Sequence, residues 1–293
     1  MPPAEGKTKF LDVLLVPFRD TNFRNLMQFL GSWGFALAIA SPFFTVFLLQ
    51  RLGYPMSTVI ALTVLSQVAN LVFVRIWGRL VDKFSNKAVL SVSGPLVLGT
   101  TALWLFTAIP GPHRFTMVPL IGIHVLRGMS MAGVTLATGN IALRLAPEGR
   151  GAPYLAANSL VGSIAGFIAP LLGGAVAGAL EAYRFSIEIT LDTPGGSTVV
   201  PAFSLQGMDF AFLLATVVGL YAMHRLSFVV EGEAVNRSTV VRNLLKEIKR
   251  PLVTFGDGDQ STVLDVPMIA LRSTQRQVSR FSWFVNNDRI RFR

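Results

Sequence analysis

Long runs of apolar residues, separated by short polar stretches, dominate the chain. Six runs are long enough to cross a hydrocarbon core of about 30 Å, which takes roughly 20 residues of helix. We place them at 26–50, 56–76, 88–109, 117–143, 153–180 and 208–230. None alternates apolar and polar residues as the strands of a membrane barrel do. Because a span must satisfy its own backbone polar groups, the pattern predicts an all-α membrane protein, a bundle of six transmembrane helices.

Two polar segments flank the predicted bundle, which occupies 26–230. The first, 1–25, has no signal-peptide pattern. It contains one short apolar patch, FLDVLLVPF, which Asp12 interrupts, and we expect this patch to lie on the membrane surface. The second segment, 231–293, is a basic tail.

The basic tail begins with a predicted amphipathic helix near 238–250. Five apolar residues recur there at helical spacing: Val240, Val241, Leu244, Leu245 and Ile248. They lie opposite four bases: Arg242, Lys246, Lys249 and Arg250. Such a helix either lies beside an anionic leaflet or docks on a partner.

The positions of the charges predict the orientation of the chain. The net charge is +10, and most bases fall before the first run, after the sixth, or in the turns on that same side. The opposite turns contain only Arg51, Arg114 and Arg184. The positive-inside rule therefore predicts a multi-pass protein with both termini in the cytoplasm. We expect the membrane to be a bacterial plasma (inner) membrane. In this setting the positive charge does not indicate a nucleic-acid partner.

Turn-forming and small residues mark two further segments. The longest outer connection, 181–207, contains LDTPGGSTVVP and predicts either a small hairpin or an irregular loop. In the fifth run, GSIAG and GAVAG are small-xxx-small patterns that let helices approach closely in lipid. Their glycines are Gly162, Gly166, Gly174 and Gly178.

Arg127 is the most informative polar residue within the runs. A charged residue in mid-membrane is a candidate functional residue, because its insertion costs roughly 2.5–3.5 kcal/mol. Its partner is an anionic or polar substrate in a wet cavity, backbone carbonyls and side-chain amides such as Gln67 or Asn70, or a carboxylate of another chain. His124 lies one turn away and is a candidate for proton coupling. Gln67 and Asn70 either line a polar path or hold helices together.

Sequence motifs for enzymes are absent. The chain has no H-E-x-x-H, G-x-S-x-G or P-loop pattern, and no pair of carboxylates within the runs. It has no cysteine, and His113, His124 and His224 fall in different segments. We therefore expect no catalytic activity, no cofactor and no metal site.

The polar stretch GRLVDKFSNKAVL, in the predicted cytoplasmic turn between the second and third runs, carries a family resemblance. It resembles the signature loop of the major facilitator superfamily of secondary transporters, G-x-L-x-D-R-x-G-R-[KR]. The matching residues are Gly78, Leu80, Asp82, Lys83 and Lys87, whereas Ser85 and Asn86 depart from the pattern. The resemblance implies a gating role for this stretch, with Asp82, Arg79 and Lys83 as a latch that faces the start of the fifth helix near Ala152.

This resemblance extends over about 20–230 and implies that the chain corresponds to the C-terminal six-helix half of such a carrier. It implies transport of a small solute by alternating access, with a cavity lined by the first, second, fourth and fifth runs. Besides the lipid bilayer and the solute, the expected partner is a separate N-terminal half, a second copy, or a larger membrane complex. The alternative is a scaffold or accessory subunit that does not transport.

Overall fold

A computed structural model of the protein describes residues 17–107, 116–147, 151–193, 196–232 and 235–249. Six of its helices are long and apolar enough to cross a membrane, which confirms the predicted bundle and a multi-pass integral membrane protein. They are α2 (Thr21–Val46, continued by the π-helical turn η1, Phe47–Arg51), α3 (Met56–Lys83), α4 (Asn86–Leu103, continued by the 3₁₀ turn η2, Trp104–Phe106), α5 (Met117–Leu145), α6 (Gly151–Ala179) and α7 (Met208–Ser227).

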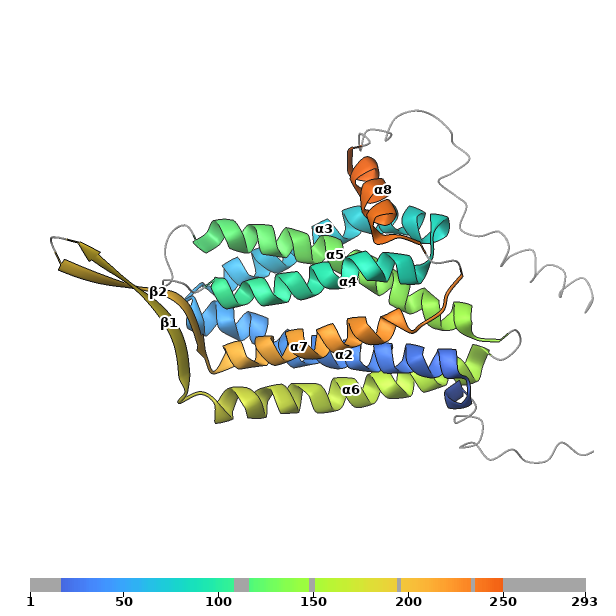
Figure 1. The fold of residues 1–293 in the computed structure, drawn as a ribbon, viewed down its shortest axis with the longest axis horizontal. Helices are drawn as coiled ribbons and strands as arrows, with labels where there is room; N and C mark the ends of the chain where they lie inside the picture. Colours follow the sequence, from blue (N-terminus) through green and yellow to red (C-terminus); the bar gives the residue numbers. More distant parts are fainter. Residues whose placement is uncertain (1–16, 108–115, 148–150, 194–195, 233–234, 250–293) are drawn as a thin grey trace, which may run out of the picture. The chain divides into compact units, whose positions relative to one another are not determined.

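The six helices pack in two groups that join through α4 and α7 (Figure 1). In the first group, α5 packs against both α3 and α4. In the second group, α2 packs against both α6 and α7. Two clusters of buried side chains fill the interior, one around Trp77 and Phe23 and the other around Trp104 and Phe212. The helices that have the most exposed faces are α3 and α6.

The first two helices extend further than the apolar runs predict. Helix α2 begins at Thr21 rather than 26, because the Asp20 carboxylate accepts hydrogen bonds from the backbone N–H groups of Asn22 (2.8 Å) and Phe23 (3.0 Å) and caps the helix. Helix α3 continues through the polar stretch to Lys83, so the predicted turn is mostly helical. Its buried residues keep helical spacing there: Ile76, Trp77, Leu80 and Val81.

Helix α6 packs on α2 through small residues at every fourth position, but not through those that the sequence suggested. The buried small residues are Ala157, Ala165, Ala169, Gly173 and Ala177. A Cβ atom on Gly173 would lie 2.9 Å from the carbonyl oxygen of Ile39, so the two backbones approach closely. Nothing lies within 4 Å of such an atom on the predicted glycines, Gly162, Gly166, Gly174 and Gly178. Their face of α6 points away from the bundle.

The connection between α6 and α7 is an antiparallel β-hairpin of β1 (Arg184–Thr193) and β2 (Gly196–Gln206), the first of the two structures that the sequence allowed. Leu205 is buried at its base, and the Phe203 ring packs on Phe106 with 5.4 Å between centroids. Beyond the base, Phe185, Ile187 and Ile189 are more than half exposed.

The predicted tail helix is α8 (Arg237–Lys249), which packs on α3 and α4 at the end of the bundle opposite the hairpin (Figure 1). Of its apolar residues, Val240 and Leu244 are buried, whereas Val241, Leu245 and Ile248 are exposed. The rest of the tail, 250–293, and most of the predicted surface patch near the N-terminus lie outside the described residues.

Candidate functional site

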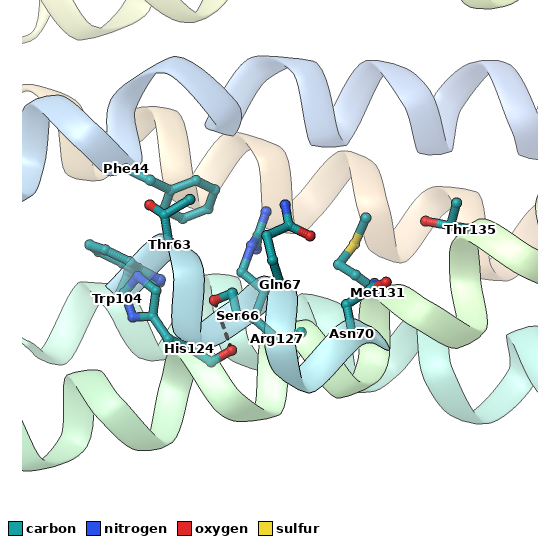
Figure 2. Close-up of a pocket in the computed structure, with 11 residues that line it drawn as sticks. Phe44, Thr63, Ser66, Gln67, Asn70, Trp104, His124, Arg127, Met131 and Thr135 are labelled. Carbon is teal, nitrogen blue, oxygen red and sulfur yellow. Dashed lines mark hydrogen bonds between the residues drawn. The ribbon is translucent and has the colours of Figure 1, made fainter. Parts of the chain in front are cut away.

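A pocket of about 450 Å³ lies among α2, α3, η2 and α5, and it contains all four polar residues that the sequence singled out (Figure 2). Arg127, His124, Gln67 and Asn70 line it together. The other lining residues are Phe44, Thr63, Ser66, Trp104, Gly128, Met131 and Thr135. No residue of α6 lines this pocket, whereas Trp104 in the turn that continues α4 does.

Helical spacing places these side chains on two facing stripes. On α3, Thr63, Gln67 and Asn70 follow one another at intervals of three and four residues, as His124, Arg127 and Met131 do on α5. The stripes approach closely at Gly128, where a Cβ atom would collide with the carbonyl oxygen of Ser66. The Ser66 hydroxyl also donates a hydrogen bond to the His124 carbonyl at 2.9 Å. A glycine and a short polar residue thus fix the wall of the pocket.

The Arg127 guanidinium has an aromatic and a hydroxyl partner. Its Cζ atom lies 4.2 Å from the centroid of the Phe44 ring, and its Nη1 donates to the Thr101 hydroxyl at 3.3 Å. It forms no ion pair with an Asp or Glu of the part of the chain that the structure describes. A guanidinium has five N–H donors, so these two contacts leave most of its hydrogen-bonding capacity for the pocket.

His124 is buried beside Arg127 and held in a fixed orientation. Its Nδ1 lies 2.8 Å from the Leu120 carbonyl, and because a carbonyl can only accept, the hydrogen is on Nδ1. The ring meets Trp104 edge-on, with 5.6 Å between centroids. The second ring nitrogen, Nε2, has no hydrogen bond to a described residue and is then the proton acceptor of this side chain.

Trp104, Phe44 and Thr101 are functional candidates that the sequence did not single out. Trp104 is 1% exposed, and its Nε1 has no hydrogen-bond partner among the residues that the structure describes. A buried donor of this kind costs free energy unless a ligand or water completes it. In the sequence all three residues look like ordinary members of apolar runs, and only the packing brings them to Arg127.

A second polar cluster joins the start of α4, the end of α5 and the segment after α7, at the end of the bundle near α8. Glu231, which follows α7, is 7% exposed. Its carboxylate accepts hydrogen bonds from the Asn86 side chain (2.7 Å) and from the backbone N–H groups of Asn86 (3.3 Å) and Lys87 (2.6 Å), the first residues of α4. Arg144 at the end of α5 lies 3.9 Å away. An acid therefore does cap a helix N-terminus at this end, but neither the acid nor the helix is the predicted one.

The predicted gating stretch divides into buried, docking and exposed residues. Leu80 is buried and Gly78 lies within α3. Arg79 pairs with Glu247 of α8 at 3.0 Å, and Lys83 donates to the Asn243 side chain at 2.9 Å. Asp82 is exposed and has no hydrogen bond or ion pair with a described residue, so the predicted contact with the start of α6 is not formed there. Asp82 was expected in a loop between two helices, but it lies in the last helical turn of α3.

Comparison with known proteins identifies no family. A scan against protein-family models gave no match, and a search of curated proteins found no similar sequence. Within the described ranges, no three His, Cys, Asp or Glu side chains come together as metal ligands would.

Proposed function

We propose that this bundle is the substrate-binding half of a secondary carrier for a small anionic solute, of the alternating-access type that the resemblance to the major facilitator superfamily implies. The observation that carries the proposal is the position of Arg127. Its guanidinium lies in mid-span, in an open pocket, with an aromatic ring and one neutral hydroxyl as its described partners.

Electrostatics favours an anion in this pocket. A buried cation is costly unless it is paired, and the ring and the hydroxyl compensate Arg127 only in part. A carboxylate or phosphate matches the planar guanidinium with two parallel hydrogen bonds. The side chains of Gln67, Asn70 and Thr63 line the same pocket and supply hydrogen bonds for the remainder of the solute. We assign His124 the proton that accompanies the solute, since its Nε2 is the proton acceptor of this side chain.

The carrier requires a partner over the pocket. Thr63, Gln67 and Thr135 are exposed at the pocket, at the depth where the neighbouring helices would meet lipid. Polar side chains at this depth face protein or a water-filled cavity. A second set of helices therefore covers this face: a separate N-terminal half, a second copy of the chain, or a larger complex. The basic end with α8 is then the cytoplasmic end, in a bacterial plasma membrane.

Ligand binding and uptake test this proposal. Purified chain in detergent is titrated with small carboxylates and inorganic anions while tryptophan fluorescence is recorded, since Trp104 lines the pocket. Uptake of any anion that binds is measured in proteoliposomes that contain the chain together with its co-purified partner. Arg127→Gln should abolish binding, and Arg127→Lys should weaken it because a lysine cannot make the two parallel bonds.

The matched control is Arg24→Gln, which removes the same charge from an exposed position near the start of α2. It should leave binding unchanged. If the Arg127→Gln protein still folds and binds anions like the wild type, the carrier proposal is wrong.

A scaffold without transport activity is the second candidate function. The outward-facing glycines of α6, at 162, 166, 174 and 178, favour it because such glycines let a partner helix approach closely. Stable co-purification with a membrane complex, together with the absence of anion binding and uptake, would support the scaffold over the carrier.

A further inference from the structure

A second pocket, of about 350 Å³, opens beside the Glu231 cluster at the α8 end of the bundle. Its polar lining comes from three elements: Ser85 and Lys87 at the start of α4, Ser227 at the end of α7, and Arg237 at the start of α8. Glu231 forms part of its wall. The pocket is separate from the one that contains Arg127, and the two share no lining residue.

The described residues that line this second pocket carry a net positive charge in spite of the buried acid. Both carboxylate oxygens of Glu231 already accept hydrogen bonds from the first turn of α4. Among the described residues that line the pocket, Lys87 and Arg237 provide two positive charges against this one negative charge, which leaves an excess of one. The Nζ of Lys87 donates to the carbonyls of Ser227 (3.0 Å) and Val229 (2.5 Å) and keeps its third hydrogen.

The charge of Arg237 lies at a position where it does not stabilise its own helix, α8. It is the first residue of α8, where the partial positive charge of a helix favours acids and disfavours bases. Its side chain is exposed and makes no hydrogen bond or ion pair with the described part of the protein. Asn236 alone provides the cap, by accepting from the backbone N–H of Ser238 at 3.0 Å. The contacts of the described residues therefore leave the Arg237 guanidinium available to an external anion.

Apolar side chains next to the second pocket place it at the level of lipid headgroups. Helix α7 ends at Ser227, and directly after it Phe228 is 48% exposed and Val230 is 65% exposed. Exposed apolar side chains just past the end of a span lie where the hydrocarbon core gives way to the headgroups. The exposed Leu245 and Ile248 of α8 lie at the same end of the bundle.

We infer that this second pocket binds the phosphate headgroup of an anionic phospholipid. Arg237 makes paired hydrogen bonds to the phosphate, and Lys87 adds its third N–H. The Ser85 hydroxyl accepts from the Ala88 N–H at 3.1 Å, so its own hydrogen is free to bond the phosphate. Phe228 and Val230 contact the glycerol and the first carbons of the acyl chains. A bound lipid thereby joins α4, α7 and α8. This inference does not depend on transport.

Lipid titration of the purified full chain tests this inference. Delipidated protein is titrated with phosphatidylglycerol or phosphatidylcholine, and native mass spectrometry counts the bound lipids. We expect one phosphatidylglycerol to bind several-fold more tightly than phosphatidylcholine. Arg237→Gln should weaken that site about fivefold, as expected for the loss of one base. The substitution leaves folding intact because the side chain has no described partner.

Arg242→Gln is the matched control, since it removes the same charge from an exposed position of α8 that does not line the second pocket. It should leave the tight site unchanged. Equal weakening by both substitutions would show a diffuse attraction and overturn the inference, as would equal binding of the two lipids. Displacement of phosphatidylglycerol by inorganic phosphate would assign the site to a soluble anion and overturn the lipid assignment.

Discussion

Glu231 and Lys87 cap each other's helices. The Glu231 carboxylate, just beyond α7, accepts the backbone N–H of Lys87 in the first turn of α4 at 2.6 Å. In return, the Lys87 Nζ donates to two carbonyls, that of Ser227 at the end of α7 and that of Val229 just beyond it. An acid at a helix N-terminus and a base at a helix C-terminus both oppose the partial charges of the helix ends. The two residues thus connect the two groups of helices at one end of the bundle.

Removal of this acid should destabilise the bundle. Glu231→Ala leaves the N–H groups of Asn86 and Lys87 without an acceptor in a buried site, so we expect a loss of about 2–4 kcal/mol in the free energy of unfolding. Denaturant unfolding of the full chain in detergent measures it. The control is Glu181→Ala, at an exposed acid after α6. Similar stability of the two variants would show that Glu231 does not support the bundle.

Substitution of Asp82, in contrast, should leave the stability of the bundle almost unchanged. Because its side chain is exposed and has no described partner, Asp82→Asn should change the free energy of unfolding by no more than about 0.5 kcal/mol. It should also leave anion uptake unchanged. Loss of uptake with unchanged stability would instead support the latch that the family resemblance implies, formed in another conformation of the carrier.

Gly128 and Gly139 lie on the same helix, but only at Gly128 should alanine destabilise the protein. At Gly128 the new Cβ would collide with the Ser66 carbonyl, so Gly128→Ala should cost about 1–3 kcal/mol and disturb anion binding by moving α3. At Gly139 no atom lies within 4 Å of a Cβ, so Gly139→Ala should be neutral or slightly stabilising. Thermal unfolding and fluorescence titration of both variants measure the difference. Equal effects would show that α3 and α5 do not approach as described.

Alanine substitutions at two adjacent glycines of α6 should distinguish an effect on folding from an effect on association with a partner. Gly173→Ala should destabilise the isolated chain by about 1–3 kcal/mol, because its Cβ would lie 2.9 Å from the Ile39 carbonyl. Gly174→Ala should leave the unfolding of the isolated chain unchanged and should weaken its association with a partner helix. Co-purification of the partner provides the second measurement. If Gly174→Ala lowers the stability of the isolated chain, that face is not outward.

The features that the sequence predicts well are those set by local periodicity. The six spans follow from hydropathy, and the common face of His124 and Arg127 follows from a separation of three residues. Periodicity also marks Leu80 as helical, but the charges around it suggested a turn. Glu231 escaped prediction because its partners lie on α4, far away in the chain, and a short connection after a span gives no pattern.

Phe84 and Ser85 alone connect α3 and α4, and the two helices pack on α5 rather than along each other. Trp77 fixes the C-terminal half of α3 on α5, since its Nε1 donates to the Met129 carbonyl at 2.8 Å. The half of α3 that carries Thr63 and Gln67 has its own attachment to α5, because the Ser66 hydroxyl donates to the His124 carbonyl at 2.9 Å. Two side-chain hydrogen bonds to carbonyls of α5, one from each half of α3, thus hold the facing walls of the pocket at a fixed separation.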